Sequence, residues 1–546
     1  MRASGLLCHP TSFPGPFGIG DLGPAAYDFL DFLAQSGQRL WQVLPLGPTG
    51  YGYSPYMSYG ALAGNPLLIS PEKLVEQGWI DPAQWQSLPT WDALQVTWPG
   101  QVAFDLAAQF KWQVMQLAYQ GFQEKGTPAQ HQAFTDYRQA QQSWLDDFSV
   151  FMALLDHYQG QEWTTWDPPL RQRHPQALDQ ARQDHAQRIA LHQFAQWVFD
   201  QQWQDLKQVA TSYGIEIIGD IPIYVAFNSA DVWAHREYFQ LDETGQPLFV
   251  AGVPPDYFSA TGQRWGNPLY NWFVLKHQDY QWWVRRFQRL LTWVDWVRLD
   301  HFRAFAGYWS IPAADETAEN GTWQPGPGAD FFHALQRHLG SLPILAEDLG
   351  EITPDVHALR EQFGFPGMKI LEFAFGDDAT NPFLPHNYER NYLVYTGTHD
   401  NDTVVGWFYG DRLDDWQREA VKRYLGGSLN PDGIHWDMIR LALSSVCRWA
   451  IIPLQDVMGL GSDSRMNTPG TSEHNWGWRY TSDMLHQGLV ERLSTMSLTY
   501  GRILWHELET MRQAVHTRLH PPQPEITEEP EESDASPEKS GKEVLS

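Results

Sequence analysis

The sequence lacks the residues and runs that mark several common protein classes. Only two of its 546 residues are cysteine, Cys8 and Cys447, so it has neither a disulfide framework nor a cysteine-based metal site. No uninterrupted apolar stretch approaches the roughly 18 residues of a transmembrane helix. The first 20 residues carry three prolines and lack the apolar region of a signal peptide. We therefore expect a soluble, cytoplasmic protein with no membrane partner.

Basic residues are scarce relative to acidic ones. The chain has 37 lysines and arginines against 65 aspartates and glutamates, which gives a formal net charge of −28 and a pI near 5.0. A chain this acidic repels nucleic acid, so nucleic acid is not an expected partner, whereas a neutral ligand meets no such repulsion. The G-x-x-x-x-G-K-[ST] phosphate loop does not occur.

Composition separates a long region, residues 1–520, from an acidic tail, residues 521–546. The tail holds five prolines and eight acidic residues, and it cannot bury enough apolar surface to order itself. Within the long region, residues 75–210 carry apolar side chains at helical spacing, which predicts a mainly helical insertion. The 27 tryptophans indicate either flat stacking surfaces or a large aromatic core.

Short apolar runs, typical of buried parallel strands, recur through the rest of the chain. Helix-length segments such as 334–339 and 415–425 separate them. This alternation predicts an α/β fold, a (β/α)₈ TIM barrel with inserted, largely helical subdomains, although topology alone leaves a doubly wound sheet open. The predicted strands are residues 40–46, 215–218, 293–299, 344–346, 369–375, 393–395 and 450–454, with a weaker one near 67–69.

Acidic residues follow four of these strands. They are Asp220, Asp300, Glu347 with its neighbour Asp348, and Asp400 with Asp402. The active sites of barrels assemble at the C-terminal ends of the strands, so we expect these acids to share one rim. A single acid in such a place is often only a helix cap, but four strands that each deliver one favour a catalytic site.

Clustered carboxylates without cysteine suit either a hard cation or glycoside chemistry, and the missing phosphate loop favours the second. Glycosidic cleavage needs one ionised and one protonated carboxyl group. Arg298 precedes Asp300 by two residues, so on one strand both face the same way and the guanidinium keeps Asp300 ionised, as a nucleophile requires. Glu347 follows two apolar residues and is the better acid. His301 and His399 lack any zinc-binding spacing, so we expect no metal.

Four segments resemble the signature regions of the α-amylase superfamily. They are GDIPIYV (219–225), VRLDHFRAF (297–305), ILAEDLG (344–350) and TGTHDNDT (396–403). The sequences of these segments are similar to those of one branch, the 4-α-glucanotransferases of glycoside hydrolase family 77, also called amylomaltases or disproportionating enzymes. Further matching segments bring the resemblance to nearly all of residues 1–510; they are 54–66, 252–272, 371–388 and 465–471.

The resemblance implies a barrel enzyme of starch and glycogen metabolism that transfers α-1,4-glucan segments between maltooligosaccharides with retention and without a cofactor. It implies that Asp300 is the nucleophile, that Glu347 is the general acid/base and that Asp400 stabilises the transition state. The supporting and substrate-binding positions it implies around them are Arg298, His399, Asp220 and Asn467.

Aromatic residues in two loops are further candidates for substrate binding. Segment 252–272 carries Trp265 beside Tyr257 and Phe258, and it could close over the site as a lid or only pack on the barrel. Tyr56 and Tyr59 lie in a stretch rich in glycine and serine, and they are either sugar platforms or packed core rings.

Two other functions remain open at this point. A hydrolase of the same superfamily, an α-glucosidase or amylase, would differ only in the loops that hold the acceptor sugar. A non-catalytic glucan-binding protein would need the catalytic acids to be lost, and all three are present. We therefore expect a transferase that acts on maltooligosaccharides and α-1,4-glucans.

Overall fold

A computed structural model describes residues 2–255 and 259–521, and its centre is one sheet of eight parallel strands. In the sheet the strands keep their order along the chain, with β12 hydrogen-bonded to β1. The Ala346 N–H donates to the Pro366 carbonyl at 2.9 Å and joins the two ends, so the predicted (β/α)₈ barrel is confirmed. The strands are β1 (Ala3–Leu7), β2 (Leu40–Gln42), β3 (Glu216–Ile221), β6 (Trp296–Leu299), β9 (Ile344–Ala346), β10 (Gly367–Ile370), β11 (Tyr392–Tyr395) and β12 (Trp449–Pro453).

The eighth strand is β1, and the strand predicted near residues 67–69 is wrong. Those residues belong largely to a 3-10 helix, Pro66–Leu68. Pro66 has no N–H to donate to a ladder, and the Asn65 side chain accepts a hydrogen bond from the Leu67 N–H at 3.0 Å, so a turn forms instead. The sequence of β1, ASGLL, was missed because its serine and glycine interrupt the apolar run, although all five residues are buried.

The strand predicted over residues 369–375 is too long. β10 ends at Ile370, and the chain turns at once into a 3-10 helix, Leu371–Phe373. Both predicted helix segments are confirmed within α14 (Gly328–Leu339) and α17 (Asp415–Tyr424), although α17 ends one residue earlier than predicted.

Proline marks where many of the helices begin. Its fixed φ suits the first helical position, where an N–H would have no partner within the helix. Within the described ranges, the α-helices that begin at a proline are α1 (Pro24–Gln35), α2 (Pro71–Glu76), α3 (Pro82–Gln86), α4 (Pro89–Leu94), α6 (Pro128–Ala140), α8 (Pro168–Arg171), α9 (Pro175–Asp184) and α15 (Pro354–Gln362).

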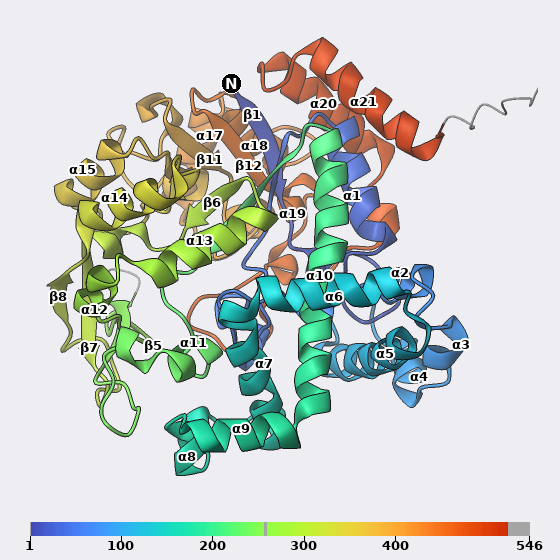
Figure 1. The fold of residues 1–546 in the computed structure, drawn as a ribbon. Coiled ribbons are helices and arrows are strands. Elements are labelled where there is room, and N and C mark those ends of the chain that lie inside the picture. Colours follow the sequence, from blue (N-terminus) through green and yellow to red (C-terminus); the bar gives the residue numbers. More distant parts are fainter. Residues whose placement is uncertain (1, 256–258, 522–546) are drawn as a thin grey trace, which may run out of the picture.

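Residues 75–210 form helices and contain no strand of either sheet. α5 (Phe104–Lys125) and α7 (Gln142–His157) lie with the shorter helices to one side of the barrel (Figure 1). The long helix α10 (Ala186–Ser212) runs from this helical region back to the barrel (Figure 1). There the Trp203 indole N–H donates to the carbonyl of Trp293, the last residue of α13 (Gln281–Trp293), at 2.9 Å.

A small antiparallel sheet stands beside the barrel. Its strand order is β5 (Gln263–Pro268), β4 (Phe249–Val253), β7 (Gly307–Pro312) and β8 (Thr322–Pro325). β7 follows the barrel strand β6 after one short 3-10 helix, so this sheet is tied directly to the chain that carries Asp300.

Some sequence predictions fall on residues outside the described ranges. Tyr257 and Phe258 of segment 252–272 are among them, as is all of the acidic tail except Pro521. Within the described ranges, no helix combines the length and the apolar character needed to cross a membrane.

The barrel interior has an apolar layer with a charged layer above it. Ile218 and Asp220 are two residues apart on β3, so their side chains point to the same face of the sheet. The same holds for Trp296 and Arg298 on β6. Below, buried side chains from the strands pack together; they are Leu7, Leu40, Ile218, Leu345, Met368, Leu393 and Ile451. Above, Asp220 and Arg298 are buried as charged groups, which is tolerable only where such groups are paired.

Gly5 permits the close approach of β1 to β2. A Cβ atom built on Gly5 would lie 2.1 Å from the Leu40 carbonyl oxygen, so the backbone itself would have to move. We predict that Gly5→Ala lowers the free energy of unfolding by about 2–4 kcal/mol in urea titrations. Gly461→Ala is the matched control, since no atom lies within 4 Å of its added carbon, and we expect a change below about 0.5 kcal/mol. Equal effects of the two substitutions would contradict this account of β1.

Candidate active site

The parallel strands deliver the acids to one rim of the barrel. Asp220 lies near the end of β3, Asp300 directly follows β6, Glu347 directly follows β9, and Asp400 lies in the loop after β11. The charges of Asp400, Arg298 and Asp300 all act on the pKa of His399, so the loop after β11 belongs to the same cluster.

Arg298 joins two of the acids. Its Nη1 donates to both carboxylate oxygens of Asp220, at 3.0 and 2.8 Å, and to Asp300 Oδ1 at 2.8 Å. The first pair follows from the sheet register, in which Asp220 and Arg298 are direct partners on neighbouring strands. Burial raises the pKa of Asp220 above its ordinary value, and the Arg298 charge opposes that rise. Arg298 therefore supplies the positive charge on which both carboxylates depend.

Glu347 is a buried carboxyl group held by two backbone donors. The His301 N–H donates to Oε2 at 2.7 Å, and the Leu349 N–H donates to Oε1 at 3.0 Å. Burial raises the pKa of Glu347 to about 8; Arg298 opposes the rise and Asp300 adds to it. His301 has a left-handed backbone, with φ of 51°, and it is in this turn that its N–H meets Glu347. Glu347 is therefore protonated at neutral pH and can act as an acid.

Asp400 is the most open of the acids, with 49% of its side chain exposed. The Asn467 side-chain amide donates to Asp400 Oδ1 at 2.6 Å, and His399 Nε2 lies 3.4 Å from Oδ2. Burial lowers the pKa of His399, so its imidazole stays neutral at pH 7. The carboxylate of Asp400 is thus oriented from two sides and remains accessible to a ligand.

Tyr56, one of the two tyrosine candidates, is built into the site by contacts that its sequence context did not indicate. Its hydroxyl donates to Asp220 Oδ2 at 2.8 Å, and its ring stacks on His399 at 5.0 Å between centroids. Tyr59, the other candidate for substrate binding, instead packs its half-buried ring against Phe151 of the helical region, with centroids 6.5 Å apart. The sequence interpretation could not separate the two, because they share the same glycine- and serine-rich stretch.

Trp265 lies on β5 with its indole edge-on to the His301 ring, at 4.9 Å between centroids. The His301 N–H also donates to Glu347, so His301 lies between this tryptophan and Glu347. The small sheet therefore reaches the site through Trp265.

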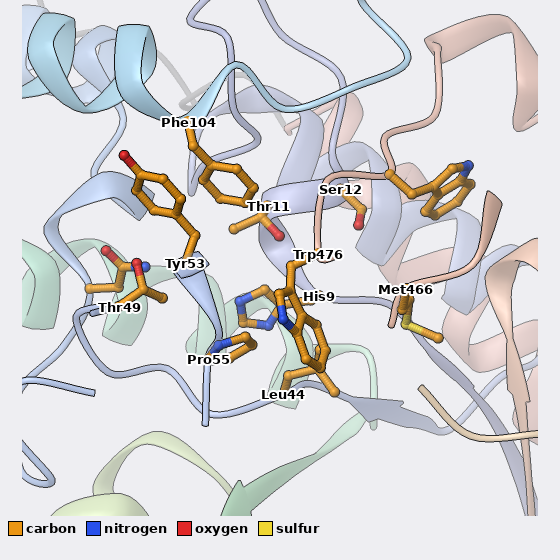
Figure 2. Close-up of a pocket in the computed structure, with 12 residues that line it drawn as sticks. His9, Thr11, Ser12, Leu44, Thr49, Tyr53, Pro55, Phe104, Met466 and Trp476 are labelled. Carbon is orange, nitrogen blue, oxygen red and sulfur yellow. The ribbon is translucent and has the colours of Figure 1, made fainter. Parts of the chain in front are cut away.

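A pocket with about 430 Å³ of empty space, part of it open solvent, adjoins these residues on the side of β1 and β2. His9 and Trp476 line this pocket, and the rings of Tyr53 and Phe104 face each other, stacked with centroids 4.3 Å apart (Figure 2). The ring centroids of Trp476 and His399 lie 6.0 Å apart, so the pocket wall is continuous with the cluster of acids.

Asp348 and Asp402 serve the fold rather than the cluster. Asp348 accepts a hydrogen bond from the Met368 N–H at 2.7 Å and faces Arg360 at 3.4 Å, at the joint between β9 and β10. Asp402 accepts from its neighbour's N–H and from the Ser462 hydroxyl, at 2.8 and 3.1 Å. These two acids therefore stabilise the fold, and the contacts above give them no part in the acid cluster at the rim.

The raised pKa of Glu347 carries a cost in stability. The folded protein keeps this proton up to about pH 8, whereas the unfolded chain loses it near the ordinary value of 4.5. Between those limits the group lowers the free energy of unfolding by up to about 1.4 kcal/mol per pH unit. We predict that Glu347→Gln is more stable relative to wild type at pH 8 than at pH 5, as measured by urea unfolding. Glu124→Gln on α5 is the control, and a difference that does not change with pH would contradict the assignment.

Comparison with known proteins agrees with this geometry. The sequence profile of the 4-alpha-glucanotransferase family matches residues 8–485. The 4-alpha-glucanotransferase of Synechocystis sp. is 52% identical over 508 residues and that of Thermus thermophilus 48% over 511, each alignment covering 92% of this chain and 99% of the relative. An amylomaltase from Streptococcus agalactiae in complex with acarbose superposes with a TM-score of 0.88 at 38% identity, covering 92% of this chain and 100% of the other. The chain belongs to the 4-alpha-glucanotransferase family.

Proposed function

We propose that this protein transfers segments of α-1,4-glucan to the 4-hydroxyl of an acceptor sugar by a retaining double displacement on Asp300 and Glu347. One observation carries the assignment. The two carboxyl groups share one rim but have opposite surroundings, since Asp300 accepts a hydrogen bond from the Arg298 guanidinium and Glu347 is buried with a pKa raised to about 8. One is suited to attack and the other to donate a proton.

In the first step Glu347 donates its proton to the bridging glycosidic oxygen while a carboxylate oxygen of Asp300 attacks the anomeric carbon. The C1–O bond breaks, the leaving glucan departs with a free 4-hydroxyl, and a glucosyl ester forms on Asp300. Arg298 keeps a hydrogen bond to Oδ1 of Asp300, which leaves Oδ2 for the attack.

Asp400 acts in both steps, because the sugar ring flattens toward an oxocarbenium ion in each transition state. Its accessible carboxylate accepts hydrogen bonds from sugar hydroxyls that strengthen as positive charge develops. Asn467 and His399 orient it, and Tyr56 holds His399 in place by ring stacking. In the second step Glu347, now ionised, takes the proton of the acceptor hydroxyl, whose oxygen displaces Asp300 from C1.

The choice between an acceptor sugar and water depends on what covers the site. Trp265 stands beside His301 and gives an incoming sugar an apolar surface that excludes water. The relatives are named 4-alpha-glucanotransferases, and this supports a transferase over the hydrolase alternative. The Streptococcus agalactiae amylomaltase was solved with acarbose, and we expect the same ligand to bind here. Both cysteines are buried free thiols, which fits action in the reducing cytoplasm.

Incubation with maltotriose alone tests the proposed function. Chromatography should show glucose and a ladder of longer maltooligosaccharides while the total of reducing ends stays constant. A rise in reducing ends with only shorter products would show that water is the acceptor and would replace the transferase by a hydrolase.

The nucleophile assignment predicts the behaviour of Asp300→Asn. We expect maltotriose turnover to fall by at least about 10⁴-fold, because an amide cannot form the glucosyl ester. Acarbose binding, measured by calorimetry, should persist. Asp136→Asn on the exposed face of α6 is the control and should turn over normally. An Asp300→Asn variant with more than about a tenth of wild-type turnover would overturn the assignment.

A further inference from the structure

We propose that Arg465 is a positioning residue that fixes Asp400 by fastening the loop after β11 to the loop after β12. The inference rests on the proposed role of Asp400 and extends it to a residue that itself touches no reacting atom. Arg465 directly follows the 3-10 helix Ser462–Ser464, and only 10% of its side chain is exposed.

The guanidinium of Arg465 spans both loops. Its Nη2 donates to the backbone carbonyl of Asp400 at 3.0 Å. Its Nε and Nη2 donate to the backbone carbonyl of Asn467 at 3.2 and 3.0 Å, and its Nη1 lies 3.6 Å from Asp402 Oδ2. The planar fork of arginine presents these donors in a fixed geometry, so the three acceptors cannot move independently.

This arrangement explains how an exposed carboxylate keeps its orientation. Asp400 and Asn467 bond to each other through their side chains at 2.6 Å, and the same guanidinium holds the backbone of both. The side-chain bond is therefore set from both ends. If the guanidinium is lost, that solvent-accessible bond and the hydrogen bond from Ser462 to Asp402 still join the two loops. The backbones of Asp400 and Asn467 lose their shared donor, however, so the distance from Asp400 to the sugar is no longer fixed.

Arg465 also neutralises negative charge at the loop after β11, in addition to holding its backbone. Asp402 of this loop is buried, as are Glu372 and Asp456, which accept hydrogen bonds from Asn401 and Thr396 of the same loop. Burial raises the pKa of Glu372 and Asp456, and the Asp402 charge adds to the rise in each. Arg465 brings positive charge to this group, and so does Arg412, which lies 3.9 Å from the same Asp402 oxygen and is 54% exposed. Arg412 therefore offers a matched control that shares the carboxylate but, by the contacts above, does not bridge the loops.

Arg465→Lys keeps the charge and removes the fork, so it separates position from electrostatics. We expect kcat for maltotriose to fall by about 10- to 100-fold with KM within about threefold, because misplacement of a transition-state group by about 1 Å costs this much. Arg412→Lys should change either constant by less than about twofold. A loss confined to KM, or equal losses in the two variants, would overturn the inference.

A double-substitution cycle with Asp400→Asn decides whether Arg465 acts through Asp400. Calorimetric binding of acarbose is the readout, because it does not need turnover. Arg465→Lys should weaken binding by about 5- to 20-fold in the wild-type background and by less than about twofold beside Asp400→Asn. An equal loss in both backgrounds would mean that Arg465 only supports the fold. Absence of maltotriose disproportionation or of acarbose binding in the wild type would instead refute the proposed function itself, so the two failures are distinguishable.

Discussion

The buried guanidinium of Arg298 is the interaction on which the catalytic rim depends. It lies in the low-dielectric interior of a barrel, where an unpaired charge would be very costly, and it contacts Asp220 on one side and Asp300 on the other. Asp220 in turn accepts a hydrogen bond from the Tyr56 hydroxyl. The Tyr56 ring stacks on His399, which lies beside Asp400. One positive charge thus links strands β3 and β6 to the loops that follow β2 and β11.

The same low dielectric has the opposite consequence for Glu347. Without a cation in direct contact, burial makes its neutral form the stable one, although two backbone N–H groups oppose this. The arginine therefore contacts Asp300 directly and leaves Glu347 in surroundings that favour its neutral form. The raised pKa of Glu347 destabilises the folded protein at alkaline pH, which is consistent with a site selected for reactivity rather than stability.

The features that could be predicted from the sequence are those encoded locally. The short apolar runs revealed most barrel strands. The acids after four of them suggested the roles proposed for Asp300 and Glu347, since a strand fixes where the next residue goes. β1 escaped because serine and glycine break its apolar pattern. The positions of Tyr56 and Arg465 also escaped, because both depend on contacts between loops far apart in the chain. Tyr56 meets His399 across 343 residues, and Arg465 meets Asp400 across 65.

The central claim is that Asp300 forms a covalent bond to the sugar while Glu347 manages the proton, and trapping the intermediate tests it most directly. Glu347→Gln incubated with α-maltotriosyl fluoride should form the glycosyl-enzyme, because fluoride leaves without an acid, and should then release it slowly, because no base activates the acceptor. Mass spectrometry of the digested protein should find the maltotriosyl group on the peptide that contains Asp300. Fluoride release without an adduct, or an adduct on any other residue, would contradict the account.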